Sequence, residues 1–283
     1  MKFFLTICVL LILLSSTASA EQSGKRDALL TRTQTKEAER LLADLGYWTG
    51  PVDGIFDSAS QSALIAFQKW ESRTVTGKLT LEELEAIRTS SSPKAREPGY
   101  AHVEVDVDRQ VLLLINDQGD VRILPVSTGS NQPFQEEGQM SIAYTPRGRF
   151  LVYDKVTGWE KGALGAMYYS SYISGGVAIH GSPNVPIRQA NHGCIRVAMF
   201  AAREMSKLLP VGTIVLVYDK VSFVSARSWV ENPELKQAAL LKSESPDYTY
   251  KTVESKTRPR FVIKRARSRI MRAGLRVSLG SQS

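Results

Sequence analysis

The spacing of the apolar residues changes from that of a helix to that of a strand near Tyr100, and this change constrains the fold more than any other feature. Within 33–90, apolar residues recur three or four positions apart, as on the buried face of a helix. From Tyr100 onward they alternate with polar residues, beginning with HVEVDVD, as in strands with one buried face. We therefore predict a multidomain chain in which a small all-α unit precedes a mostly-β domain over 100–220.

Three short helices are expected within 33–90. Turn signals in GYWTGPVDGIF separate the first from the second, which we expect to begin at Asp57. Thr80-x-x-Glu83 is a capping box for the third. The unit contains no nucleophile or metal-ligand cluster, and its apolar pattern is self-contained. We therefore expect a binding module that folds alone.

Residues 91–99 are polar and rich in residues that break helices, so they are expected to form a linker. Ser91-x-x-Lys94 in this stretch superficially matches the motif of serine acyl-enzymes. That chemistry needs both side chains on one helix, which Pro93 disfavours. No Lys-Thr-Gly follows downstream, and we reject the motif.

Residues 1–20 have the features of a secretory signal peptide. Lys2 precedes an apolar run, and Ala18-Ser19-Ala20 gives a small-residue cleavage site. We therefore expect an exported protein of the periplasm or cell wall, with 263 residues after removal of the first 20. Since Cys8 leaves with the signal, Cys194 is the sole cysteine of the mature chain, and it has no partner for an internal disulfide.

The positive charge is concentrated at the C-terminal end of the chain. Residues 251–283 hold ten Lys/Arg and one acidic residue, whereas residues 21–250 carry a net charge of −2 out of the total of +8. This distribution gives no basic body for nucleic acid. Within the extension 221–283, we expect the tail to be disordered or amphipathic and to bind an anionic membrane or wall polymer.

The surroundings of Cys194 are those of a candidate nucleophile. A reactive thiol needs a base and donors for an oxyanion. His180 ends the apolar segment GVAIH, and His192 lies two residues before the thiol. Gly193 permits a turn that aims backbone N–H groups at an oxyanion, and Arg196 suits a substrate carboxylate. A buried, inert cysteine is the structural alternative. A zinc site is disfavoured because neither H-E-x-x-H nor cysteine pairs are present.

Two known families resemble the two halves of the chain. Residues 100–220 resemble the YkuD-type L,D-transpeptidases through AIHGSPNVPIRQANHGCIRV, with support from ILPVSTGS, YTPRGRFLVYDK and GALGAMYYSSYISGGVAIHG. Residues 33–90 resemble the peptidoglycan-binding-domain-1 modules through AERLLADLGYWTGPVDGIFD, SALIAFQKW and VTGKLTLEEL. Asn191 departs from the catalytic family, which usually has Ser or Thr at this position, but it keeps local hydrogen-bonding capacity.

The resemblance implies cysteine acyl transfer on peptidoglycan stem peptides, in peptidoglycan biosynthesis and cell-wall organisation, with no metal or other cofactor. It assigns the nucleophile to Cys194, the general base to His180 and the orientation of its ring to the Gly181 carbonyl. The further site residues that it implies are Gly193, His192, Arg196, Asn191 and a tyrosine from Tyr168, Tyr169 or Tyr172.

The sequence leaves the reaction's acceptor open. It is a diaminopimelate amine, a lipoprotein lysine, a free D-amino acid or water, and water would make the protein an L,D-carboxypeptidase or a cross-link hydrolase. A non-catalytic wall-binding protein is the rival class, against which the intact Cys194, His180 and Arg196 argue.

Overall fold

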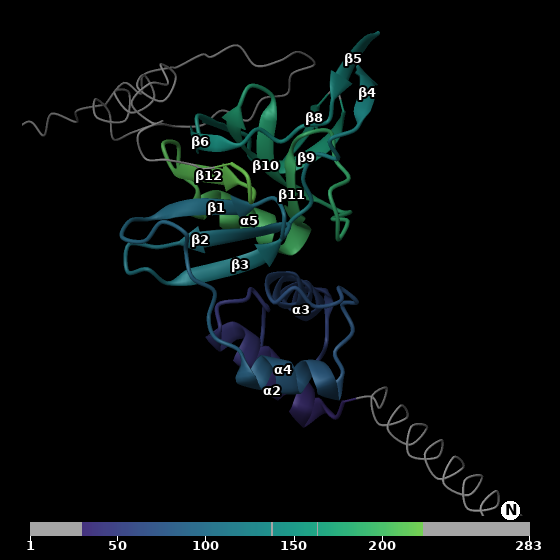
Figure 1. The fold of residues 1–283 in the computed structure, drawn as a ribbon, viewed down its shortest axis with the longest axis vertical. Coiled ribbons are helices and arrows are strands. Elements are labelled where there is room, and N and C mark those ends of the chain that lie inside the picture. Colours follow the sequence, from purple (N-terminus) through teal and green to yellow (C-terminus); the bar gives the residue numbers. More distant parts are fainter. Residues whose placement is uncertain (1–29, 137, 163, 223–283) are drawn as a thin grey trace, which may run out of the picture.

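The computed structural model describes residues 30–222 except 137 and 163. It shows a helical unit beside a larger domain of two β-sheets (Figure 1), which confirms the predicted fold class. The predicted signal peptide 1–20 lies outside the described residues, as does the extension 221–283 apart from its first two residues. No helix in the described part of the chain is long and apolar enough to cross a membrane.

Polar side chains cap the helices of the N-terminal unit. The unit contains α2 (Arg32–Asp44), α3 (Ser58–Trp70) and α4 (Leu81–Thr89). Thr31 forms a capping box at α2, and Asp57 caps α3 at the predicted position. Thr80 accepts a hydrogen bond of 3.2 Å from the N–H of Glu83, but the Glu83 carboxylate forms an ion pair with Arg73 at 3.1 Å. Only one half of the predicted capping box at α4 is therefore present.

A buried carboxylate holds the loop between α2 and α3. Glu39 accepts hydrogen bonds from the N–H groups of Asp53 and Gly54, at 3.1 and 2.8 Å, and from the Ser60 hydroxyl at 2.9 Å. Gly54 has φ +82°, and a Cβ atom there would lie 2.7 Å from the Arg32 carbonyl oxygen. The Asp-Gly turn seen in the sequence thus requires glycine for both its conformation and its close contact.

Two sheets form the body of the β domain. The first has the order β3-β2-β1-β12-β6, and its strands are β1 (His102–Asp106), β2 (Val111–Ile115), β3 (Val121–Pro125), β6 (Gly148–Leu151) and β12 (Ile214–Tyr218). The second has the order β11-β10-β9-β7, with β8 also on β9, and its strands are β7 (Asp154–Lys155), β8 (Trp159–Gly162), β9 (Gly165–Ser174), β10 (Val177–Ser182) and β11 (Ile195–Ala198). Strands β4 (Pro133–Glu136) and β5 (Gln139–Ile142) form a separate hairpin, and α5 (Met199–Leu208) follows β11 directly.

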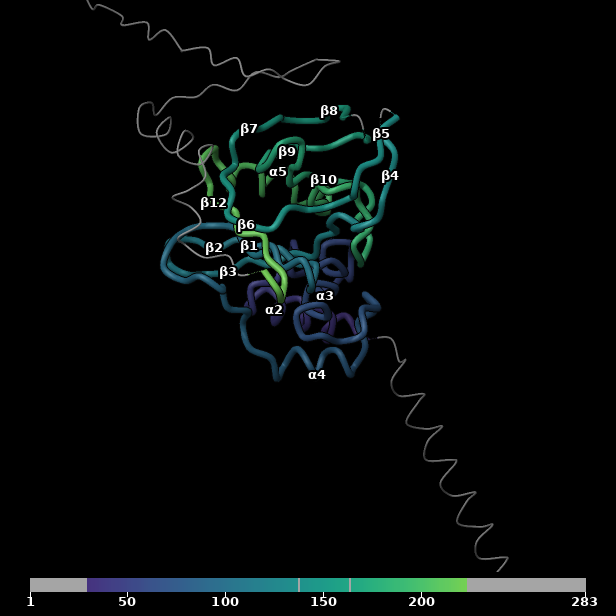
Figure 2. Tube along the Cα trace, turned by 45° about the horizontal axis from the view of Figure 1, so that its top comes forward, coloured from purple at the N-terminus to yellow at the C-terminus, as the bar shows by residue number. Residues whose placement is uncertain are grey.

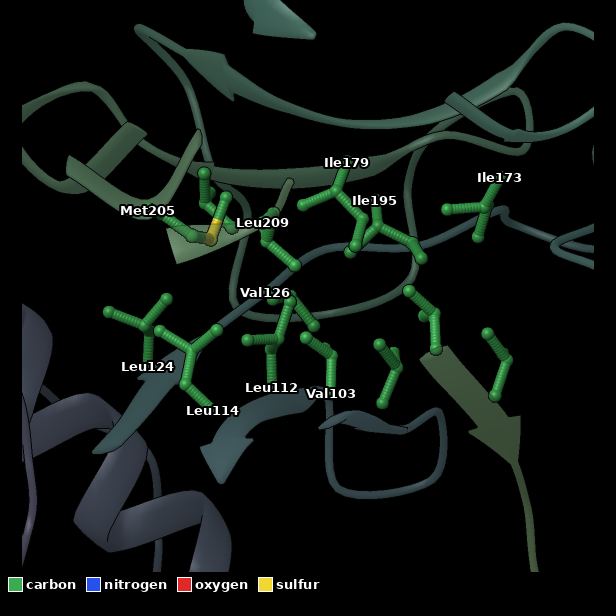
Figure 3. Packing of buried hydrophobic residues seen from close by; sticks show 14 of the residues in the cluster. Val103, Leu112, Leu114, Leu124, Val126, Ile173, Ile179, Ile195, Met205 and Leu209 are labelled. Atoms are coloured by element: carbon green, nitrogen blue, oxygen red, sulfur yellow. The ribbon is translucent and has the colours of Figure 1, made fainter. Parts of the chain in front are cut away.

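The apolar faces of the two sheets and of α5 enclose one core (Figure 3). Ile179 and Ile195 from the second sheet lie opposite Leu112 from the first, and all three are fully buried. Helix α5 packs so closely on β10 that a Cβ atom at Gly181 would lie 2.6 Å from the Ala202 Cβ. This core fixes one face of β10 and β11 and leaves their opposite face for the site described below.

The helical unit packs directly on the first sheet, where α3 lies against β3 and β2 (Figure 2). Leu42 and Phe67 of the unit share one hydrophobic cluster with Leu113 and Ile123 of the sheet. All four side chains are fully buried. Strands β2 and β3 therefore contribute to the core of the helical unit, and folding of residues 33–90 alone stays a prediction.

Backbone pairing also joins the two units. Tyr47 forms a parallel bridge with Ile123 on the edge strand β3. The Trp48 N–H donates to the Ile123 carbonyl at 3.1 Å, and the Ile123 N–H donates to the Gly46 carbonyl at 2.8 Å. This pairing satisfies polar groups that the edge strand would otherwise expose.

Lys69 on α3 forms a buried polar contact between the units. Its Nζ donates to the carbonyl oxygens of Gln110 and Val126, at 3.1 and 3.0 Å. Burial lowers the pKa of Lys69 to about 7, because an ammonium group loses hydration when it is removed from water.

The predicted linker over 91–99 has no helix or strand, but it is fixed to the first sheet. The buried Glu104 carboxylate accepts hydrogen bonds from the N–H groups of Arg96 and Glu97, at 2.9 and 2.8 Å. Glu97 also forms an ion pair with Arg149 at 2.9 Å. The connection therefore holds the helical unit and the β domain in one arrangement.

Candidate functional site

The register of β10 and β11 brings the predicted catalytic residues together. The strands are parallel, and His180 pairs with Arg196. Since Cys194 lies two residues before Arg196, and side chains alternate along a strand, all three lie on the same face. Ile179 and Ile195 point from the opposite face into the core. His180 and Cys194, which are fourteen positions apart in the sequence, thus lie on the same face of this strand pair.

The His180 ring is buried and has a fixed orientation. Its Nδ1 lies 2.9 Å from the Gly181 carbonyl oxygen, and since a carbonyl only accepts, Nδ1 carries the proton and Nε2 has the free lone pair. Burial lowers the pKa of His180 to about 4, although the hydrogen bond with Gly181 opposes this shift. The ring is therefore neutral at pH 7 and able to accept a proton at Nε2.

The Cys194 thiol is partly exposed, and its Sγ lies 3.7 Å from the Gly176 carbonyl oxygen. Burial raises the pKa of Cys194 above its ordinary value, and the negative charge of Glu160 adds to this effect. A hydrogen bond from the Ala178 backbone and the positive charge of Arg196 act in the opposite direction. The resting site thus contains a neutral thiol beside a neutral imidazole.

Gly193 sits where no other residue fits without strain. It has φ +141°, and a Cβ atom there would lie 2.9 Å from the Tyr144 carbonyl oxygen. Its own carbonyl accepts a hydrogen bond of 2.7 Å from the Thr145 hydroxyl. Because a trans peptide places C=O and N–H on opposite sides, this bond directs the Cys194 N–H away from Thr145.

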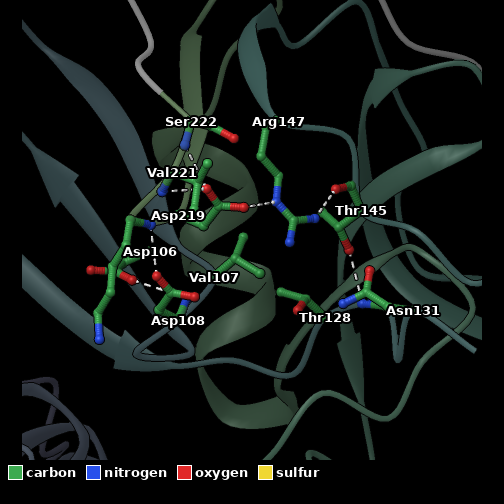
Figure 4. A network of polar contacts seen from close by, with 12 residues as sticks. Asp106, Val107, Asp108, Thr128, Asn131, Thr145, Arg147, Asp219, Val221 and Ser222 are labelled. Carbon is green, nitrogen blue, oxygen red and sulfur yellow. Dashed lines mark hydrogen bonds and ion pairs between the residues drawn. The ribbon is translucent and has the colours of Figure 1, made fainter.

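Thr145 belongs to a polar network beneath this turn (Figure 4). Its hydroxyl also accepts a hydrogen bond of 2.8 Å from the Gly129 N–H. Arg147 donates to the Thr145 carbonyl and forms an ion pair with Asp219 at 2.9 Å. Sequence reasoning did not identify Thr145 as a site residue, and its signal lay only in the quoted segment YTPRGRFLVYDK.

Asn191 is buried rather than directed toward solvent. Its side-chain amide donates to the Ser127 carbonyl at 2.5 Å and, at 3.3 Å, to the carbonyl of Cys194 itself. Its backbone N–H donates to the Thr128 carbonyl at 3.0 Å. Asn191 therefore connects the cysteine turn to the segment that follows β3.

His192 is exposed, and its ring lies 4.7 Å from that of Phe134, centroid to centroid. Phe134 belongs to β4, so this contact joins the β4–β5 hairpin to the cysteine turn. The supporting role of His192 in the turn stays a prediction.

The three candidate tyrosines have different orientations. Tyr172 pairs with Ala178, which shares a face with His180. Tyr168 pairs instead with Gly181 and packs against the hydrophobic core. Tyr169 has φ +52° and lies in a β-bulge opposite His180. Of the three, Tyr172 is therefore placed on the face of the thiol.

No group of three or more His, Cys, Asp or Glu side chains suited to a metal ion occurs within the described residues. The His180 Nδ1 donates a hydrogen bond to the Gly181 backbone carbonyl, and the Cys194 Sγ lies near the Gly176 backbone carbonyl. These contacts suit acid–base and nucleophilic chemistry.

Comparisons with known proteins identify both halves of the chain. The family model described as L,D-transpeptidase catalytic domain (YkuD) matches residues 100–217, and the one described as putative peptidoglycan binding domain matches residues 31–87. No curated protein matches the chain.

Solved structures show the same similarity. An L,D-transpeptidase from Xylanimonas cellulosilytica is 34% identical over 65% of this chain and 92% of its own, with a TM-score of 0.60. An L,D-transpeptidase from Stackebrandtia nassauensis is 21% identical over 65% of this chain and 90% of its own, with a TM-score of 0.38.

Proposed function

Because the chain belongs to the YkuD family of L,D-transpeptidases and also carries a peptidoglycan-binding domain, we propose that it is a cysteine acyltransferase of peptidoglycan. Its donor is a tetrapeptide stem, and its acceptor is an amine of a second stem. The observation that carries the proposal is the placement of Cys194, His180 and Arg196 on one face of two paired strands.

In the first half-reaction, the Cys194 Sγ attacks the carbonyl that precedes the terminal D-amino acid. His180 Nε2 takes the thiol proton, and a bond forms between sulfur and carbon. When the carbon–nitrogen bond breaks, the imidazolium gives this proton to the departing amine. The products are a thioester on Cys194 and a free D-amino acid.

In the second half-reaction, an acceptor amine attacks the thioester carbonyl. His180 takes a proton from the attacking amine and returns it to the departing Cys194 sulfur, which regenerates the enzyme. The new amide is a cross-link between two stems. Attack by water in the same position gives hydrolysis, which is the alternative reaction.

The developing oxyanion needs donors that are already in position. We assign this role to the N–H groups of Gly193 and Cys194, since the bond from Thr145 to the Gly193 carbonyl fixes the peptide between them. Of the three tyrosines, Tyr172 shares a face with His180, but its hydroxyl hydrogen-bonds with Glu160, so it would have to leave this contact to donate to the oxyanion.

Two roles at the site follow from burial and charge. Arg196, which has no ion pair in the described part of the chain, is available to a substrate carboxylate. Asn191 is assigned a positioning role in place of substrate contact, because its amide is occupied by the Ser127 and Cys194 carbonyls.

Mass spectrometry of muropeptides tests this proposal. Purified enzyme acting on isolated sacculi rich in tetrapeptides is expected to release D-amino acid and form new stem-to-stem cross-links, and Cys194→Ala is expected to do neither. Release of D-amino acid without cross-links would favour the hydrolase. Products from Cys194→Ala equal to those of the wild type would refute the cysteine mechanism. The exported state expected from residues 1–20 remains part of the proposal, since peptidoglycan lies outside the cytoplasmic membrane.

A further inference from the structure

Lys69 of the helical unit is hydrogen-bonded to the segment against which the cysteine turn is built. The residue is buried, and its Nζ donates to the backbone carbonyl oxygens of Gln110 and Val126, at 3.1 and 3.0 Å. Because an amino group that is removed from water requires such partners, these two carbonyls fix the position of Nζ. Neither the wall binding expected of the helical unit nor the proposed reaction uses this contact.

Gln110 links the Lys69 contact to Thr128. Gln110 is buried and has φ +56°, a left-handed conformation that is uncommon outside glycine and persists where the surroundings fix it. Its Oε1 accepts a hydrogen bond of 2.9 Å from the Thr128 N–H, and its Nε2 donates to the Thr128 hydroxyl at 2.7 Å. The Val126 N–H donates to the Gln110 carbonyl at 2.9 Å. Gln110 and Lys69 therefore hold residues 126–128 in place.

The same segment contacts the cysteine turn both before and after the nucleophile. The Thr128 carbonyl accepts a hydrogen bond of 3.0 Å from the Asn191 N–H. The Asn191 side-chain amide donates to the Ser127 and Cys194 carbonyls. Ser127 also pairs with Arg196 through two backbone hydrogen bonds, of 2.9 and 3.2 Å. The backbone on both sides of Cys194 is therefore held by residues 127 and 128.

We propose that Lys69 is a positioning residue for Cys194, so that the helical unit contributes to the geometry of the catalytic turn as well as to the wall binding expected of it. This proposal rests on the function proposed above. Since the side chains between Lys69 and the turn are buried, and protein interiors are close-packed, a change at Lys69 is transmitted to residues 126–128. A displacement of about 1 Å can cost on the order of 10²-fold in rate.

Single-turnover release of D-amino acid from a soluble tetrapeptide stem tests this proposal. The stem has no glycan, so that binding of the helical unit to the wall does not contribute. We expect Lys69→Met, which keeps the length of the side chain but removes its donors, to lower the acylation rate constant by about tenfold. The stem concentration that gives half of the maximal rate should change little, because Lys69 has no place in the proposed substrate site. Lys69→Gln, which keeps amide donors on a shorter side chain, should give an intermediate rate and serves if Lys69→Met does not fold.

Leu42→Ala is the matched control. Leu42 is fully buried in the core that the helical unit shares with β2 and β3, so its truncation weakens the same junction without removing a hydrogen bond. We expect folded Leu42→Ala to acylate at the wild-type rate. A wild-type rate in the folded Lys69 variants, or an equal loss of rate in Leu42→Ala, refutes the positioning role.

Backbone amide resonances of isotope-labelled protein separate this proposal from the proposed reaction. We expect the resonances of Asn191 and Cys194 to shift in Lys69→Met and to keep their wild-type positions in Leu42→Ala. If they do so while the wild type releases no D-amino acid, the proposed reaction fails and the positioning role stands. If they keep their wild-type positions in Lys69→Met, the positioning role is refuted, whichever reaction the protein catalyses.

Discussion

The hydroxyl of Thr145 donates a hydrogen bond of 2.7 Å to the carbonyl of Gly193, and this contact fixes the peptide bond that precedes the nucleophile. The Thr145 hydroxyl also accepts a hydrogen bond of 2.8 Å from the Gly129 N–H. It therefore links the cysteine turn to a loop that is distant in the sequence. The side chain touches no reacting atom in the proposed mechanism. The role proposed for Thr145 is to position the N–H groups assigned to the oxyanion.

Replacing Thr145 with Val keeps the shape of the side chain but removes both hydrogen bonds. We expect the rate of D-amino-acid release to fall by roughly 10–100-fold, since misdirected oxyanion donors cost about 10²–10³ when lost outright. The KM for the donor peptide should change little. Thr213→Val is the control, because its hydroxyl caps an exposed turn at the Pro210 carbonyl. If Thr145→Val releases D-amino acid at the wild-type rate, the proposed positioning role of Thr145 is refuted.

The rate at which Cys194 is alkylated should depend on pH, because its thiol is neutral in the resting site. Because the pKa of His180 is lowered to about 4 and that of Cys194 is raised, both groups are uncharged from above pH 4 to beyond the ordinary thiol range. We expect iodoacetamide to alkylate Cys194 slowly at pH 7 and faster above pH ~9. The rate of D-amino-acid release should decline only as pH approaches 4 from above, as His180 becomes protonated. An alkylation midpoint below pH 7 would instead reveal a thiolate–imidazolium pair.

Lys69 makes the stability of the whole protein depend on pH. The unfolded lysine keeps its proton to pH ~10.4, whereas the folded one releases it at about 7. The unfolded state thus binds more protons between these values, so the free energy of unfolding rises with pH in that window. Urea titrations from pH 7 to 9 are expected to show a rise of up to ~2 kcal/mol, which Lys69→Met removes. Lys78 is exposed, so Lys78→Met should keep the wild-type dependence of the unfolding free energy on pH. If Lys69→Met kept the same dependence, groups other than Lys69 would be its cause.

The shared core predicts that the helical unit and the β domain unfold together. Leu113 of β2 is fully buried in the cluster formed with the helices. We expect Leu113→Ala to destabilise the chain by about 2–5 kcal/mol while a single transition remains. Leu208→Ala, at a half-exposed position on α5, should have a much smaller effect. Two separate transitions, only one of them shifted by Leu113→Ala, would mean that the units are independent.

The sequence alone predicted the elements of the fold and the candidate for the catalytic group. Apolar spacing is a local property, so it predicted helices within 33–90, the strands HVEVD and VLLLI and the helix after the cysteine. A single cysteine near two histidines also needed no tertiary information to be recognised. The resemblance to the L,D-transpeptidases, carried by the same segment, is confirmed by the comparisons.

Only the tertiary structure decided which residues lie close together. The register between β10 and β11 set His180 opposite Arg196, and the bulge in β9 separated Tyr172 from Tyr168 and Tyr169. Thr145 became part of the site through a contact across 48 positions of the chain. Sheet pairing and the burial of the helical unit on β3 depend on which apolar faces meet during packing. Which faces meet depends on interactions throughout the chain, so it cannot be predicted from the apolar spacing within a single segment.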